Sequence, residues 1–170
     1  MPVHPAGIHI TQVNKFPYLV IRMTEEPLHM AEPVKKRNII VRESLHEDFA
    51  VYLNGNHVLV IEAVSDMEYE SRHVDLIINT VKEFTGSLKH LVLVEAGDHT
   101  AIGFEGLKSL AKPDAFSYAH AKAYVIKTLS QRLMANFYMK FFRPEIPVRI
   151  FSKRQEAEAW LLKKFRHLVP

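Results

Sequence analysis

The 170-residue chain contains no cysteine. Disulfides, a thiol nucleophile and thiolate-bound zinc are therefore excluded for this chain. Long apolar runs are also missing: the run from Leu91 to Val94 is far shorter than the ~20 residues that a membrane-spanning helix needs. The first residues lack a basic segment followed by an apolar core, so we expect no secretory signal and a cytoplasmic location.

The rest of the composition is ordinary for a globular domain, with 48% hydrophobic and 24% charged residues. Positive charge is concentrated late in the chain: residues 127–170 hold ten Lys or Arg against three acidic residues, whereas residues 1–126 hold twelve against sixteen. Such asymmetry can mark a surface for acidic partners. We interpret it as the solvated basic faces of two helices, and we do not expect nucleic-acid binding because recognition motifs and interleaved aromatic residues are few.

Prolines set the beginning of the chain apart. Five of the nine prolines lie within the first 35 residues, and proline breaks helices and removes the N–H that a strand would donate. We therefore expect residues 1–45 to form an irregular arm with one or two strands, near Tyr18–Met23 and Asn38–Arg42. Residues 46–170 are expected to form the domain.

The first half of that domain is predicted to hold a hairpin and a helix. Asn54-Gly55 suits a tight turn and joins strands over residues 49–53 and 58–61. Ser65 and Glu68 have the spacing of a capping box that opens a helix, which ends at Gly86. The apolar face of this helix has the spacing of one helical stripe and comprises Val74, Ile77, Ile78, Val81 and Phe84.

The second half alternates strands with helices. Strands are predicted over residues 91–94, 121–126 and 148–151, and helices over 104–111, 129–142 and from Ser152 onward. Thr128–Gln131 and Ser152–Gln155 have capping-box spacing. The buried face of the last helix is expected to comprise Ala157, Trp160, Leu161, Phe165 and Leu168. Because alternating strands and helices pair in parallel, we predict an α/β fold with a mixed sheet, antiparallel at its hairpin, and about four helices.

Sequence features in the last third carry a family resemblance. They are Leu133, Asn136-Phe137, Pro144, Pro147 and Ala159-Trp160-Leu161. With the element order over residues 49–165, they resemble the STAS/SpoIIAA-like domains of anti-sigma factor antagonists, and more closely a bacterial group of uncharacterised STAS-like proteins. This resemblance implies a non-enzymatic regulatory module that binds a protein partner.

The resemblance also implies a phosphorylated serine where a strand leads into the following helix. Gly106-Leu107 fits the family pattern there, but the preceding pair is Phe104-Glu105 instead of serines. The phosphorylation switch is therefore missing from the sequence. Glu105 is interpreted as a favourable charge at a helix N-terminus.

Possible chemistry is concentrated in one loop after the strand at residues 91–94. Glu95, Asp98, His99 and Thr100 lie where open α/β sheets place ligands. His99 could act as an acid or base oriented by Glu95 or Asp98, and this would be a hydrolase-type enzyme. The alternative is a polar loop in which Asp98 or Thr100 caps the next helix. None of the ten histidines has metal-site spacing, so we expect neither a metal nor a cofactor.

Two further patterns concern surfaces. Tyr118, His120 and Lys122 alternate along a strand, which we interpret as an exposed sheet edge. The helix at 129–142 carries two apolar stripes, one more than a helix on a sheet needs; they are Leu129, Leu133, Phe137 and Phe141, and Met134, Tyr138 and Phe142.

The surplus stripe predicts a covering group. We favour the proline-rich arm or a second copy of the chain over a lipid-like ligand. The first prediction is thus a non-enzymatic STAS-like interaction module, a possible homodimer, with binding residues Asp98, His99, Thr100, Met134, Tyr138 and Phe142. The alternative is a binder of a small apolar or anionic amphiphilic ligand.

Overall fold

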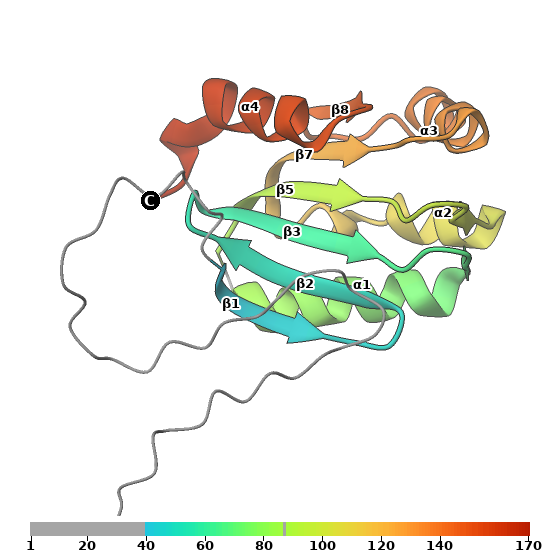
Figure 1. The fold of residues 1–170 in the computed structure, drawn as a ribbon, viewed down its shortest axis with the longest axis horizontal. Coiled ribbons are helices and arrows are strands. Elements are labelled where there is room, and N and C mark those ends of the chain that lie inside the picture. The colour runs from blue at the N-terminus through green and yellow to red at the C-terminus, as the bar shows by residue number, and fades with distance from the viewer. Residues whose placement is uncertain (1–39, 87) are drawn as a thin grey trace, which may run out of the picture. The chain divides into compact units, whose positions relative to one another are not determined.

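The structure is a computed structural model that describes residues 40–86 and 88–170 (Figure 1). The strand expected near Tyr18–Met23 lies outside these residues. Eight strands and four α-helices are present in the described part, together with short 3-10 turns at Pro113–Ala115 and Arg166–Leu168. In chain order they are β1 (Ile40–Leu45), β2 (Phe49–Asn54), β3 (Val58–Ala63), β4 (Glu68–Tyr69), α1 (Ser71–Thr85), β5 (His90–Glu95), β6 (Ala101–Ile102), α2 (Phe104–Leu110), β7 (Ala119–Val125), α3 (Leu129–Phe142), β8 (Val148–Phe151) and α4 (Arg154–Phe165).

The main sheet has six strands in the order β1-β2-β3-β5-β7-β8. The pairs β1–β2 and β2–β3 are antiparallel, and the pairs β3–β5, β5–β7 and β7–β8 are parallel. This confirms the predicted α/β fold with a mixed sheet and four helices. Within the described residues, the strand expected near Asn38–Arg42 is present as β1, which begins at Ile40 and pairs with β2.

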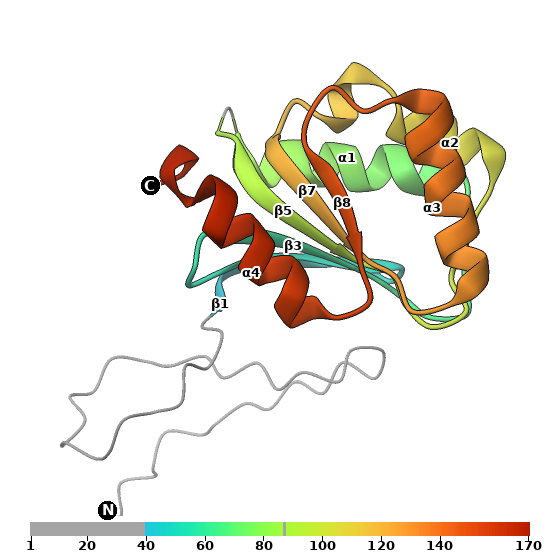
Figure 2. The ribbon, with the colours of Figure 1, turned by 90° about the horizontal axis from the view of Figure 1, so that it is seen from above.

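Helices cover both faces of the sheet (Figure 2). The helix α4 packs on one face, against alternate residues of β3, β5 and β7 that include Val60, Leu93 and Ala123. On the other face, Val74, Ile78 and Val81 of α1 pack against Leu59, Ile61 and Val92. The short α2 lies beside α1, and α3 lies on the same side of the sheet as α1 and α2 (Figure 2). The apolar stripe predicted for α1 is confirmed.

Local turns and caps differ from several predictions. In the hairpin, three residues separate the strands, and His57 adopts the left-handed conformation with φ of 61°. The Asn54 Oδ1 atom accepts hydrogen bonds from the N–H groups of Asn56 and Val58, both at 3.0 Å. The hairpin is confirmed, and the N–H of His57 donates to the Asn54 carbonyl at 3.0 Å to close its turn. The positive φ expected at Asn54-Gly55 was wrong, because His57 is the left-handed residue of this turn.

Two of the three predicted capping boxes were also wrong. The residue before α1 is Glu70, whose N–H donates to Nδ1 of His73 at 3.0 Å, because the short strand β4 takes up Glu68. The cap of α4 is Lys153, without a side-chain hydrogen bond, and the hydroxyl of Ser152 accepts instead from Arg132. The box at Thr128–Gln131 is confirmed.

The end of α1 agrees with the prediction, whereas the end of α4 differs from it. The α1 helix ends at Gly86, with φ of 61°, as predicted. At the end of the chain, Ala157 and Leu161 of α4 are buried, but Leu168 is exposed. The prediction for Leu168 was wrong because the chain leaves the α-helix after Phe165 and turns into a 3-10 segment.

Candidate functional site

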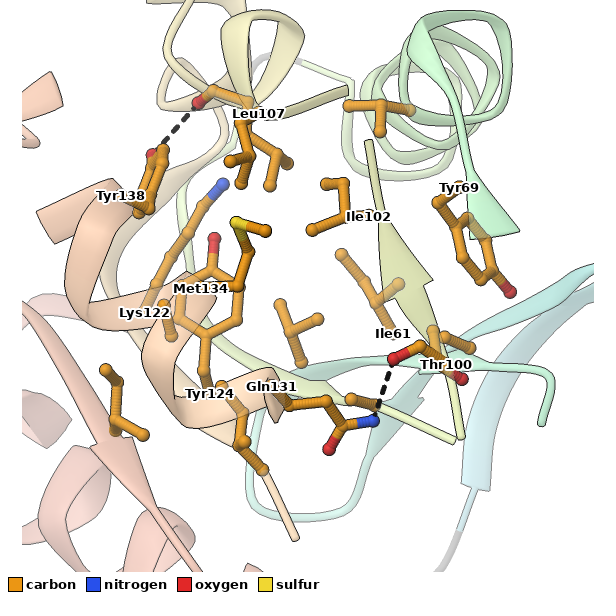
Figure 3. A pocket seen from close by; sticks show the side chains of 18 of the residues that line it. Ile61, Tyr69, Thr100, Ile102, Leu107, Lys122, Tyr124, Gln131, Met134 and Tyr138 are labelled. Atoms are coloured by element: carbon orange, nitrogen blue, oxygen red, sulfur yellow. Dashed lines mark hydrogen bonds between the residues drawn. The ribbon is translucent and has the colours of Figure 1, made fainter. Parts of the chain in front are cut away.

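An apolar cavity of about 250 Å³ lies between the sheet and the helices α1, α2 and α3 (Figure 3). Its walls come from β3, β5 and β7 and from one side of each helix. Most of the lining side chains are aliphatic; the polar ones are Thr100, Ser130, Gln131, Lys122 and four tyrosines, Tyr69, Tyr118, Tyr124 and Tyr138. Three of the predicted binding residues, Thr100, Met134 and Tyr138, line this cavity.

Two residues of α3 that line the cavity, Gln131 and Tyr138, hydrogen-bond to the rest of the domain. Near its N-terminus, the Gln131 amide donates to the carbonyl oxygens of Gly97 at 2.9 Å and Thr100 at 3.1 Å. Further along, the Tyr138 hydroxyl donates to the carbonyl of Leu110 at 3.1 Å (Figure 3). Tyr138 is the only buried residue of α3. Between these anchors, Met134 and Ala135 line open space instead of packing onto strands.

Lys122 is the single cationic group among the lining residues, and its side chain is almost completely buried, at 1% exposure. Its amine donates hydrogen bonds to the carbonyl of Ala115 and, at 2.9 Å, to the hydroxyl oxygen of Tyr118. Among the residues that the structure describes, no carboxylate forms an ion pair with this amine. Burial lowers the pKa of Lys122 to about 7.

Burial of Lys122 overturns the interpretation of Tyr118, His120 and Lys122 as an exposed sheet edge. The strand β7 is internal, because β5 and β8 pair with its two sides. Tyr118 is buried in the apolar cluster that includes Val74 and Val81 of α1, Lys122 is buried against Ala115 and Tyr118, and His120 is partly buried. Alternation along a strand shows which residues share a face, but not what covers that face.

The tyrosines keep the remaining polar lining uncharged. Burial raises the pKa of Tyr118, Tyr124 and Tyr138 above the ordinary value, and it raises the pKa of Tyr69 to about 12. Within the described part of the chain, the Tyr124 hydroxyl has no hydrogen-bond partner, and its ring points into the cavity (Figure 3). The site therefore combines apolar walls, neutral hydroxyls and one amine.

The loop after β5 does not assemble the catalytic group considered above. His99 is exposed, has a left-handed backbone with φ of 55°, and forms no hydrogen bond with Glu95 or Asp98 in the described structure. Glu95 pairs with Arg154 at 3.2 Å, and Asp98 pairs with Lys127 at 3.3 Å. Each carboxylate thus has a cationic partner that is not the imidazole.

The same loop does not cap the following helix either. The N-cap of α2 is Gly103, because the short strand β6 separates the loop from the helix. The N–H of Asp98 donates to the Ser65 hydroxyl at 3.0 Å, and the Thr100 hydroxyl donates to the Val64 carbonyl at 3.0 Å. These bonds attach the loop to the segment that follows β3, so the predicted cap was wrong.

The remaining predicted residues lie near the cavity without lining it. Phe142 is half-buried and packs against Tyr138, with ring centroids 5.7 Å apart. In the first turn of α2, the Glu105 carboxylate is exposed and pairs with Lys108 at 2.7 Å, and the Phe104 ring is also exposed.

A polar network on the opposite face of the sheet was missed by sequence reasoning. The Arg154 guanidinium contacts Glu62 at 2.6 Å, Glu95 at 3.2 Å and the Tyr52 hydroxyl at 2.6 Å, and that hydroxyl also donates to Glu62. Burial and the adjacent Glu62 raise the pKa of Tyr52. The sequence signal for this network is Glu62, a charged residue that directly follows four apolar residues of β3. The network anchors the first residue of α4 to the sheet.

Metal and membrane sites are not indicated. Over residues 40–86 and 88–170, no group of three or more His, Asp or Glu side chains could hold a metal ion. No helix in this part of the chain is long and apolar enough to cross a membrane.

The comparisons with known proteins give one match. Residues 51–166, from β2 to the end of α4, match the family model described as Domain of unknown function (DUF7793). The chain belongs to this family. The matched segment includes every residue that lines the cavity. Curated proteins and solved structures yield no match.

Proposed function

We propose that this member of the DUF7793 family is a non-catalytic binding protein for a small amphiphilic molecule, which occupies the cavity beneath α3. The observation that carries the proposal is the apolar cavity of about 250 Å³ with one buried amine in its wall. Ligand sites are mostly apolar with a few placed polar groups, and they measure ~300–1,000 Å³. At about 250 Å³ the cavity lies just below this range, and it suits a small ligand.

A groove next to the cavity supports the same function. A shallow groove runs along the outside of α2 and α3, and three residues line both this groove and the cavity: Leu107, Ser130 and Met134. Met134 is unbranched and partly exposed, so a change of its rotamer would connect the groove with the cavity without unfolding the helix.

The chemistry of the lining favours binding over catalysis. Among the described residues that line the cavity there is no carboxylate or imidazole, and the one amine, that of Lys122, already donates hydrogen bonds to Ala115 and Tyr118. His99, the candidate for hydrolase-type chemistry, is exposed on the loop and does not line the cavity.

A cavity-filling variant tests the proposal. Ala135→Trp would place an indole in the cavity, whereas Ala159→Trp would place one on the exposed face of α4. We expect an environment-sensitive apolar dye to bind the wild type and Ala159→Trp but not Ala135→Trp, and native mass spectrometry of protein from its own cells to show a retained small molecule. Equal dye binding by both variants, with each folded by circular dichroism, would contradict the proposal.

A second function, the STAS-like interaction module, is favoured by a different observation. The other stripe of α3 faces outward: Leu133 is 63% exposed and Phe141 is 65% exposed. The exposed Arg132 and Lys140 lie on the same helix, so the complementary partner is a protein surface that is apolar and edged by acidic residues.

The two functions can be separated on the same protein. The double variant Leu133→Ser and Phe141→Ser removes two exposed apolar side chains of the stripe and leaves the cavity lining unchanged. We expect dye binding to persist in this variant. Partners captured by the wild type and by Ala135→Trp, but not by the double variant, would support the interaction module, whereas capture that is indifferent to the stripe would count against it.

A further inference from the structure

The two faces of β7 differ sharply in chemistry. Ala121, Ala123 and Val125 face α4, whereas Lys122 and Tyr124 face the cavity. Side chains two residues apart on a strand lie side by side, so the amine of Lys122 and the free hydroxyl of Tyr124 are presented from one strand to one space (Figure 3). In Figure 3 the Lys122 side chain extends toward Leu107 from beneath Tyr138.

The hydrogen bonds of Lys122 leave one donor unused. A protonated lysine has three N–H donors, and two acceptors are present, the Ala115 carbonyl and the Tyr118 hydroxyl. The amine also lies over the Tyr118 ring, 4.4 Å from its centroid, and 5.2 Å from the centroid of Phe116. All of the groups that contact the amine are uncharged, so the protonated amine has neither a third acceptor nor a counter-ion in the described structure. A buried cation without a partner is unfavourable.

We propose that Lys122 binds the carboxylate of a medium-length monocarboxylic acid whose hydrocarbon chain fills the cavity. The inference rests on the proposed ligand-binding function and adds to it the chemical class of the ligand. A carboxylate supplies the missing acceptor and the missing negative charge together. The hydroxyl of Tyr124 is a second donor for the other carboxylate oxygen.

The charge of the site favours a monoanion. Every titratable group that lines the cavity is either Lys122 or one of the four tyrosines, and all four tyrosines stay neutral at pH 7. One cation neutralises one carboxylate, whereas a phosphate carries about two charges at pH 7 and is usually bound by arginine or by several backbone N–H groups. The apolar lining, formed by residues such as Ile61, Val94 and Ile102, matches an alkyl chain.

Binding of an acid at this position couples to protonation. Burial lowers the pKa of Lys122 to about 7, so about half of the empty sites hold a neutral amine at neutral pH. A bound carboxylate favours the charged amine and raises its pKa, and the protein therefore takes up a proton as it binds the acid. An uncharged ligand of the same length produces no such uptake.

Calorimetry of the full chain with decanoate and decan-1-ol tests the proposal. We expect the wild type to bind decanoate about tenfold or more tightly than decan-1-ol at pH 7. Titration in buffers with different ionisation enthalpies should show uptake of up to about half a proton for decanoate and none for decan-1-ol. In Lys122→Met and Lys122→Gln, decanoate binding should fall to the level of decan-1-ol, and binding of decan-1-ol should persist.

The outcomes separate the two proposals. Binding of decan-1-ol and decanoate with equal affinity, without proton uptake and without an effect of Lys122→Met, would overturn the carboxylate assignment and leave the cavity as an apolar site. Absence of binding for both compounds would overturn the ligand-binding function itself. If neither Lys122 variant folds, the proton uptake of the wild type still decides the assignment.

Discussion

The amine of Lys122 and the hydroxyl oxygen of Tyr118 lie 2.9 Å apart, joined by a buried hydrogen bond within the cavity wall. The same amine donates to the carbonyl of Ala115, so one side chain fastens the turn between α2 and β7 to the strand. Lys122 thus organises the protein even when the cavity is empty, and its remaining donor is available for a ligand. Lys122 therefore has a structural role and a proposed binding role. Unfolding of Lys122→Met measures the first, and decanoate binding by Lys122→Met and Lys122→Gln measures the second.

Stability should depend on pH through Lys122. The unfolded chain keeps this proton up to the ordinary pKa of 10.5, whereas the folded protein releases it near pH 7. Between these values the unfolded state binds more protons, so the contribution of Lys122 to folding stability becomes more favourable as the pH rises. We expect the unfolding free energy of the wild type, relative to Lys122→Met, to increase by up to about 1.4 kcal/mol per pH unit from pH 7 to about pH 9.5. Urea unfolding of both proteins measures this, and a constant difference would contradict the burial of the amine.

Gln131 should be a main anchor of α3. Its amide donates to two carbonyls of the loop after β5, and its side-chain oxygen accepts the N–H of Thr128 at 3.3 Å. We expect Gln131→Ala to lower the unfolding free energy by about 1–2 kcal/mol. Hydrogen exchange should show greater loss of protection in α3 than in α1. The neighbouring Arg132→Ala is the control, because its exposed side chain makes a single bond to Ser152 and should cost less than about 0.5 kcal/mol.

The network around Arg154 should be sensitive to removal of one partner. Arg154→Met would leave the buried Glu62 carboxylate without its cation, and we expect a loss of about 3–5 kcal/mol in thermal or urea unfolding. The double variant Arg154→Met with Glu62→Gln should recover part of this loss, because the uncompensated charge is gone. Losses that simply add in the double variant would show that the two side chains do not interact.

Position 106 of α2 is a glycine because a larger side chain would not fit there, although glycine disfavours the helix. A Cβ atom at this position would lie 2.7 Å from the Tyr69 carbonyl oxygen and 2.8 Å from a side-chain carbon of Ile102. Alanine is the better helix former by about 1 kcal/mol, but the contact with the backbone of β4 outweighs this gain. We therefore expect Gly106→Ala to destabilise the domain by about 1–3 kcal/mol. Lys108→Ala in the same helix is the matched control, and a stabilised Gly106→Ala protein would show that α2 can move away from β4.

Much of the fold follows from short-range patterns in the sequence. The apolar stripe of α1, the hairpin, the Thr128 cap and the continuous apolar strand β5 were predictable because each depends on residues a few positions apart. Two predicted caps failed where β4 or β6, strands of two residues each, changed the boundary of the next helix, and the cap at Ser152 failed because its hydroxyl accepts a hydrogen bond from Arg132. Such strands form only through pairing with a distant segment.

Only the tertiary structure shows the site. The sequence predicts that α3 has two apolar stripes, but not that one faces a cavity while Leu133 and Phe141 remain exposed. It shows that Lys122 lies on a strand, but not that its amine is buried against the Ala115 carbonyl and the Tyr118 hydroxyl, beside the cavity that α3 lines. A cavity is a place where elements from distant segments fail to touch, and no local period in the sequence encodes that distance.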